Sequence, residues 1–105
     1  MVTKDEILDY LREIKPELEK DGITKIGLFG SYAKGEAGIA SDIDITIETT
    51  EKFTKKFIGF KALIYLSELR SKIAKHFKVP TDLCDSTGFK DDIKRQKVLE
   101  GVVYV

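Results

Sequence analysis

The stretch "GSYAKGEAGIASDIDI", residues 30–45, decides how this chain is interpreted. It starts with a Gly-Ser step, continues through a segment rich in Gly and Ala, and ends with Asp42 and Asp44. The alternation in "SDIDITIE" (41–48) predicts a β-strand with its isoleucines on one side and its polar residues on the other. Residues two apart on a strand lie about 6.6 Å apart on the same side, so the two aspartates repel unless a cation lies between them.

The segments around this stretch alternate between helical and strand patterns. In chain order they predict a helix over 3–20 with a Thr3/Glu6 capping box, a strand over 23–29, a helical turn over 31–34 and a strand over 41–48. A long helix over 53–77, a strand over 80–85, a short helix over about 90–99 and an apolar tail over 101–105 follow. This order predicts an α/β (α+β) sandwich in which helices pack on one face of a small sheet, within a single domain spanning 1–105.

The predicted long helix has apolar residues at the spacing of a core-facing stripe. Phe57, Phe60, Leu63 and Ile64 are the first of these expected core residues, and Ile73 and Phe77 continue the stripe. Gly59 is a weak point within the helix, costing about 1 kcal/mol relative to Ala.

The net charge is zero, but the charges are unevenly distributed along the chain. Residues 1–51 hold 6 basic and 12 acidic side chains, whereas residues 52–78 hold 8 basic and 1 acidic. The basic segment can serve a polyanionic ligand or an acidic partner, or it can be a solvated helix face. The neutral total argues against dedicated nucleic-acid binding. No apolar run approaches the length of a membrane span, and we expect no membrane contact.

Three single residues have structural interpretations. The single cysteine, Cys84, cannot form an internal disulfide, which is typical of a reducing cytoplasm, and within an apolar strand it resembles a small buried hydrophobe. The single histidine, His76, lies near a predicted helix end, where it favourably meets the helix dipole. Tyr104 and its valine neighbours are expected in the core or in a dimer contact.

The aspartates predict one half of a metal site. Mg²⁺ favours one or two carboxylates together with phosphate oxygens and water. The other half should come from the third strand, where Asp82 is the first candidate and Asp85, of opposite parity, is the second. Two solvated aspartates on an exposed strand remain the alternative for the pair alone.

The Gly30-Ser31 step predicts a phosphate site. A strand ends, glycine permits close approach of the backbone, and a helical turn begins with free N–H groups and a hydroxyl. Lys34 would add a positive charge one turn later, or it would be an ordinary exposed lysine.

One pattern resembles the signature of the nucleotidyltransferase superfamily to which DNA polymerase beta and kanamycin nucleotidyltransferase belong. It consists of Gly30-Ser31, a spacer of ten residues, and Asp42-x-Asp44. Chain length and layout more closely resemble the minimal (MNT, or MntA-like) nucleotidyltransferases of prokaryotes. That resemblance implies a mixed sheet with helices on one side. One departure is visible: many members have Arg where this chain has Lys34, which keeps the charge but loses bidentate phosphate contact.

The resemblance also implies an activity and a partner. Gly30, Ser31 and Lys34 would hold the triphosphate of ATP, Asp42 and Asp44 would bind two Mg²⁺ ions, and Asp82 would be the third carboxylate and activate the acceptor. The implied reaction is transfer of AMP to a tyrosine of a HEPN-family toxin, with the chain as a cytoplasmic antitoxin in a type VII-like pair. The alternative is a non-catalytic module that neutralises a toxin by contact, which would have no physical reason to keep three converging carboxylates.

Overall fold

The computed structural model describes residues 1–88 and 100–105 of the chain. Its elements are α1 (Lys4–Lys20), β1 (Ile23–Phe29), α2 (Gly30–Lys34), β2 (Ile43–Thr49), α3 (Glu51–Lys56), α4 (Phe60–Phe77), β3 (Thr81–Asp85) and β4 (Val103–Tyr104). The helix predicted over about 90–99 lies outside the described residues. Within the described ranges, no helix is long and apolar enough to cross a membrane.

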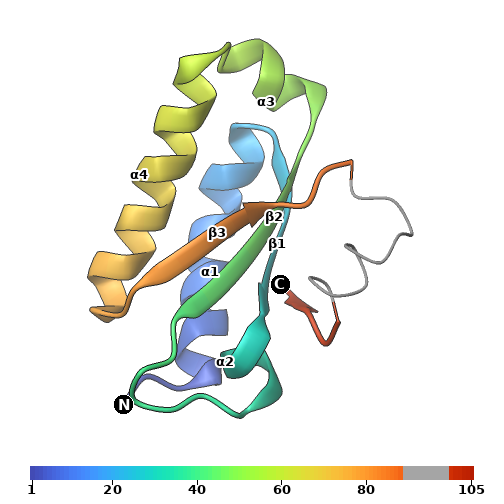
Figure 1. The fold of residues 1–105 in the computed structure, drawn as a ribbon. Coiled ribbons are helices and arrows are strands. Elements are labelled where there is room, and N and C mark those ends of the chain that lie inside the picture. Colours follow the sequence, from blue (N-terminus) through green and yellow to red (C-terminus); the bar gives the residue numbers. More distant parts are fainter. Residues whose placement is uncertain (89–99) are drawn as a thin grey trace.

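The strands form one mixed sheet in the order β3-β2-β1-β4 (Figure 1). β1 runs antiparallel to both β2 and β4, whereas β2 and β3 are parallel. Parallel neighbours need a crossover connection, which α3 and α4 provide. The two long helices, α1 and α4, lie on the same face of the sheet (Figure 1). The predicted mixed sheet with helices on one face is therefore confirmed.

The core forms between these helices and the inner face of the sheet. Thr3 caps α1 by accepting a hydrogen bond from the Glu6 N–H at 3.2 Å, which confirms the N-cap half of the predicted capping box. The Glu6 carboxylate accepts from the Thr3 hydroxyl instead of from the Thr3 backbone N–H. The buried isoleucines alternate along β2, and the buried side chains of α1 recur every three or four residues. Those with no more than 1% exposure include Ile7, Leu11, Ile23, Ile26, Leu28, Ile43, Ile45, Ile47 and Ile73.

The prediction of one helix over 53–77 is wrong, because the helix is interrupted between Lys56, where α3 ends, and Phe60, where α4 begins. Gly59 in this break has a φ of +61°, a conformation that residues with a side chain rarely adopt. Gly59 therefore lies directly before α4, in the interruption between the two helices, instead of within one continuous helix.

The expected core positions at the start of α4 are also wrong. Phe60, Leu63 and Ile64 are 81%, 64% and 56% exposed, whereas Leu69 and Ile73 further along α4 are buried. The rings of Phe53, Phe57 and Tyr65 pack together, with centroids 4.6 to 5.3 Å apart. Because this aromatic cluster occupies the inner side of the α3–α4 junction, the other apolar residues there face outward.

The C-terminal tail contains an edge strand that the sequence did not predict. Val103 and Tyr104 pair with Leu28 and Gly27 of β1. A Cβ on Gly27 would lie 2.8 Å from the Tyr104 ring, so the absence of a side chain lets this ring lie against the strand. The Lys25 ammonium lies 5.5 Å from the centroid of the same ring. Tyr104 thus packs within the chain, although it stays 37% exposed.

Candidate active site

Asp44 and Asp82 lie directly beside each other across the parallel strands. The register pairs Asp44 of β2 with Asp82 of β3, and paired residues of neighbouring strands present their side chains on the same face about 4.8 Å apart. Asp42 comes one residue before β2 and is exposed. We call these three residues the carboxylate end of the sheet.

The carboxylate end carries uncompensated negative charge. Burial raises the pKa of Asp44 above its ordinary value, and the neighbouring charges of Asp82 and Asp42 raise it further. Among the described residues, no hydrogen bond or ion pair reaches any of the three carboxylates. A half-buried carboxylate beside two like charges costs folding free energy, and a bound cation would remove that cost.

Gly30 is shaped by its contact with Asp44. Its φ is +72°, and a Cβ built at this position would lie 2.2 Å from the Asp44 Oδ2 atom. The antiparallel pairing of Phe29 with Asp44 places the start of α2 against this carboxylate. Gly30 is thus required both for its backbone conformation and for the close approach to Asp44, and the second requirement was not visible in the sequence.

The other two predicted phosphate-binding residues lie on the same short helix. Ser31 is half-buried, and its carbonyl accepts the N–H of Glu36 at 2.9 Å, which closes the turn after α2. Lys34 is exposed and makes no ion pair with the described residues. Of the three predicted phosphate-binding residues, Gly30 is therefore the one that directly approaches the carboxylate end, whereas the Lys34 side chain lies beside Gly101.

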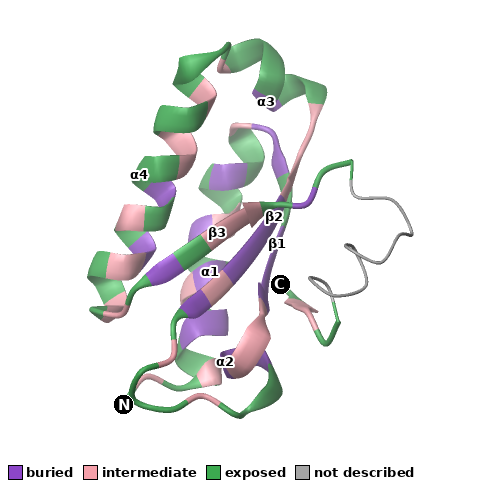
Figure 2. Cartoon of the chain, viewed as in Figure 1, coloured by how far each residue is buried: buried purple, intermediate pink, exposed green. Residues whose placement is uncertain are grey.

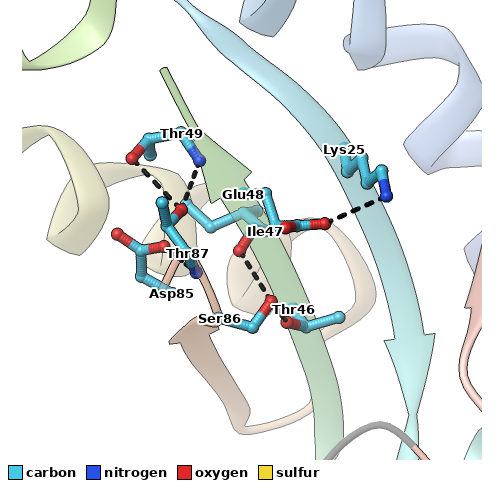
Figure 3. Close-up of polar contacts among 8 residues, drawn as sticks. All are labelled: Lys25, Thr46, Ile47, Glu48, Thr49, Asp85, Ser86 and Thr87. Atoms are coloured by element: carbon cyan, nitrogen blue, oxygen red, sulfur yellow. Dashed lines mark hydrogen bonds and ion pairs between the residues drawn. The ribbon is translucent and has the colours of Figure 1, made fainter. Parts of the chain in front are cut away.

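Asp85, the alternative third carboxylate, performs a structural task. Its Oδ1 atom accepts the Thr87 N–H at 2.9 Å, while the Thr87 hydroxyl accepts the Thr49 N–H at 2.6 Å (Figure 3). Asp85 also pairs with Ile47, three positions beyond Asp44 on β2. It therefore organises the turn after β3, whereas Asp82 is the carboxylate that faces Asp44.

The same turn explains why Thr46 is buried, although the strand pattern predicted it on the polar face with Asp44. Thr46 donates to the Ser86 hydroxyl at 2.9 Å, and Ser86 donates to the Ile47 carbonyl at 3.1 Å (Figure 3). Both hydroxyl groups are fully buried and hydrogen-bonded, which satisfies them without solvent. The polar side of β2 therefore holds a carboxylate without a partner among the described residues at Asp44, a buried hydrogen-bonded hydroxyl at Thr46, and a carboxylate paired with Lys25 at Glu48 (Figure 3).

The donor set fits a metal ion that is shared with a ligand. In residues 1–88 and 100–105, no three Asp, Glu, His or Cys side chains surround one point, so the expected convergence of all three carboxylates is not present there. Oxygen donors suit Mg²⁺, which is commonly held by one or two carboxylates plus substrate phosphates and water rather than by a protein cage. The pair formed by Asp44 and Asp82, with Asp42 nearby, matches that requirement.

The remaining single residues have structural surroundings. His76 lies in the last turn of α4, as predicted, and its ring stacks on Tyr10 with centroids 3.8 Å apart. Cys84 is half-buried on β3 and pairs in register with Thr46. The position of His76 agrees with the interpretation drawn from the sequence, whereas Cys84 is half-buried and not buried as expected.

Comparison with known proteins identifies the fold and its chemistry. The family profile described as the nucleotidyltransferase domain matches residues 6–105. The chain belongs to the nucleotidyltransferase domain family. Protein adenylyltransferase MntA of Thermococcus cleftensis is 35% identical to this nucleotidyltransferase over 106 residues, covering all of this chain and 98% of the relative. MJ0126 of Methanocaldococcus jannaschii is 31% identical over 106 residues, covering both chains fully.

Solved structures resemble this nucleotidyltransferase over nearly its whole length. A crystal structure of a toxin–antitoxin with AMP-PNP superposes with a TM-score of 0.64 at 25% identity, covering 98% of this chain and 72% of the other. A mutant of the toxin–antitoxin MntA-HpeT superposes with a TM-score of 0.60 at 23% identity and the same coverage, which supports the fold. The chain is therefore a nucleotidyltransferase enzyme whose fold occurs in toxin–antitoxin structures.

Proposed function

We propose that this nucleotidyltransferase transfers AMP from ATP to a hydroxyl group of a partner protein. The acceptor is a tyrosine of a HEPN-family toxin, and the chain acts in the cytoplasm as the antitoxin of a type VII-like pair. A relative that matches the whole chain is named a protein adenylyltransferase, and the fold is similar to that of toxin–antitoxin structures, one of them with AMP-PNP. The observation that carries the proposal is the pairing of Asp44 with Asp82 beside Gly30.

Each residue of the carboxylate end has a role in this proposal. Asp42 and Asp44 would hold two Mg²⁺ ions together with the nucleotide, and Asp82 would share the ion nearer the acceptor. Bound Mg²⁺ would supply charge neutralisation for the triphosphate and the developing negative charge. Gly30 and Ser31 would hold the triphosphate through backbone N–H groups and the hydroxyl, and Lys34 would add a positive charge.

The transfer step conserves atoms and charge in a simple way. The acceptor oxygen forms a bond to the α-phosphorus of ATP while the bond from that phosphorus to the bridging oxygen breaks, and pyrophosphate leaves. An Asp82 carboxylate oxygen takes the proton of the acceptor hydroxyl, as a general base in hydrogen-bond reach can do. Within residues 1–88 and 100–105 Asp82 makes no hydrogen bond or ion pair, so one of its oxygens can take this proton while the other shares the ion.

The experiment is a labelling assay that contains Mg²⁺, ATP labelled on the α-phosphate, and the proposed partner, which is the protein encoded by the gene next to that of this chain. The wild type should label the partner, and the Asp42→Asn/Asp44→Asn variant should label nothing while keeping its fold by circular dichroism. Mass spectrometry of the labelled partner should locate AMP on a tyrosine.

Two outcomes would contradict the proposal. Undiminished labelling by the double variant would remove the carboxylate end from the mechanism. A wild type that binds the partner tightly yet labels nothing would favour neutralisation by contact.

A further inference from the structure

The junction of α3 and α4 exposes an unusually apolar surface. Ile58, Phe60, Leu63 and Ile64 are 71%, 81%, 64% and 56% exposed, and we call them the α3–α4 patch. Figure 2 shows exposed residues covering the start of α4 at the end of the molecule where α3 lies. Contiguous exposed apolar residues of this size mark interaction surfaces more often than isolated ones do.

The α3–α4 patch is shallowly grooved and borders polar residues. One hollow is lined by Phe60, Leu63, Ile64, Ser67 and Glu68. A second, smaller hollow beside it shares Ile64 and Glu68 and is also lined by Phe57, Lys61 and Tyr65. An outward apolar ridge with adjoining hollows is the form that a packed helix or loop of another protein can fill.

The patch is supported from its inner side by a hydrogen bond, an ion pair and ring contacts. The Tyr65 hydroxyl donates to Asp21 at 2.8 Å, and the Tyr65 ring lies 4.6 Å from that of Phe57. Lys56 makes an ion pair with the same Asp21 carboxylate. The inner side of the junction is therefore anchored to the end of α1, and the apolar side chains of the patch lie on its outer side.

The charges around the α3–α4 patch indicate the chemistry of its occupant. Residues 52–61 contain four lysines and no acidic residue, and Glu68 is the one acidic residue among those that line the two hollows. Lys55 and Lys56 pair with Glu51 and Asp21, whereas Lys52 and Lys61 have no ion-pair partner among the described residues. A matching surface would have an apolar centre and an acidic rim.

The same charges disfavour the other occupants. Two copies of this chain meeting through the patch about a two-fold axis would bring together two surfaces of the same net positive charge. A nucleic acid would satisfy the lysines but would leave large exposed apolar side chains facing a phosphate backbone. A protein with an apolar, acid-rimmed face satisfies both features.

The α3–α4 patch lies far from the carboxylate end. α4 has 18 residues, so its two ends are about 27 Å apart. Phe60 begins this helix, whereas Asp82 follows soon after its other end. Figure 1 shows the α3–α4 junction and the starts of β2 and β3 at opposite ends of the molecule.

We propose that the α3–α4 patch docks the acceptor protein of the transfer reaction through an acid-rimmed apolar face of that protein. This inference rests on the proposed function, because it assigns the acceptor a second contact remote from the chemistry. Docking there raises the residence time of the acceptor and leaves nucleotide binding unchanged. Its loss therefore appears in the KM for the acceptor and not in the affinity for MgATP.

The test uses the protein encoded by the neighbouring gene. Calorimetry measures its binding to this chain, and the labelling assay gives the kinetics of AMP transfer to it. The Phe60→Ser/Leu63→Ser variant should raise both the Kd and the KM for this protein by at least about tenfold, with unchanged MgATP affinity. Lys61→Glu should weaken binding severalfold and flatten its salt dependence. The matched control is Lys72→Ser/Lys75→Ser, two exposed positions in the second half of α4, which should leave both constants unchanged.

The outcomes separate this inference from the proposed function. Binding at wild-type strength by Phe60→Ser/Leu63→Ser, absence of binding by the wild type, or a wild-type dimer that this variant dissociates would each overturn the docking surface. Asp42→Asn/Asp44→Asn should bind the partner normally without labelling it. If the wild type binds through the patch but transfers nothing, the proposed reaction fails and the docking surface stands.

Discussion

The carboxylate end exposes charged groups and the α3–α4 patch exposes apolar groups, and both regions lower the stability of the folded chain. At the carboxylate end, Asp44 is half-buried beside two like charges and its pKa is raised. At the patch, Phe60 and Leu63 stay in water although their burial would each stabilise a fold by about 1.5–3 kcal/mol. Their supports also differ, because strand register holds the aspartates whereas a glycine break and an aromatic cluster hold the patch.

This difference indicates how the molecule separates its tasks. The position of a carboxylate must be accurate for chemistry, and adjacent hydrogen-bonded strands are the most rigid support available in a small domain. A docking surface needs area and charge more than accuracy, and the outer side of a helix supplies them. Variants that affect one region but not the other would sharpen this contrast.

The largest expected effect is at the third carboxylate. Asp82→Asn should lower the rate of nucleotide transfer by about 10³-fold, because a lost metal ligand and base costs several kcal/mol of transition-state stabilisation. Asp85→Asn is the matched control, since Asp85 accepts the Thr87 N–H and does not face Asp44. Single-turnover labelling would measure both. Equal losses in the two variants would break the distinction between the aspartates.

The next largest effect is a difference in the free energy of unfolding between substitutions on the buried side and on the exposed side of α4. Leu69→Ala removes a buried side chain and should lower the free energy of unfolding by about 3 kcal/mol. Leu63→Ala, on the exposed side of the same helix, should change it by no more than about 0.5 kcal/mol. Urea denaturation followed by circular dichroism would compare them. A large loss for Leu63→Ala would mean that the patch is part of the core after all.

Gly30 should be less tolerant than Gly35, although both have a φ of +72°. A Cβ at Gly30 meets Asp44 at 2.2 Å, whereas a Cβ at Gly35 meets nothing within 4 Å. Gly35→Ala should cost about 1 kcal/mol from its backbone alone, and Gly30→Ala should cost about 1–3 kcal/mol more because Asp44 must move. Chemical denaturation gives the difference, and similar costs would show that the Asp44 contact is easily relieved.

The smallest expected effect is a gain of stability at the carboxylate end. In EDTA, Asp44→Asn should raise Tm by about 2 °C or more near pH 7. The raised pKa of Asp44 means that its contribution to stability is present below the unfolded pKa and is lost as the pH rises through the folded pKa. The advantage of asparagine should therefore shrink between about pH 7 and pH 4. Calorimetric scans that show an unchanged or lower Tm for the variant at neutral pH would contradict this electrostatic account.

Several features of the fold and of the site followed from local patterns. The Thr3 cap, the alternation of Ile43, Ile45 and Ile47, and the mixed sheet with helices on one face agree with the structure. These features depend on neighbours in sequence, on helical and strand periodicity, and on the order of the elements. The helix break at Gly59 was missed because a single glycine can be tolerated within a helix, and only its positive φ distinguishes the two cases.

By itself, the sequence determined that Asp42 and Asp44 lie two residues apart where a glycine-containing loop leads into a strand, and that positive charge gathers in residues 52–78. The predicted strand over 41–48 begins at Ile43 in the structure, so Asp42 lies just before it. Only the tertiary structure decided that Asp82 rather than Asp85 faces Asp44, because strand register depends on how the crossover through α3 and α4 returns the chain to the sheet. It also decided that Phe60, Leu63 and Ile64 lie outside the core. Periodicity shows which residues share a side of a helix, but what that side packs against depends on segments far away in the chain.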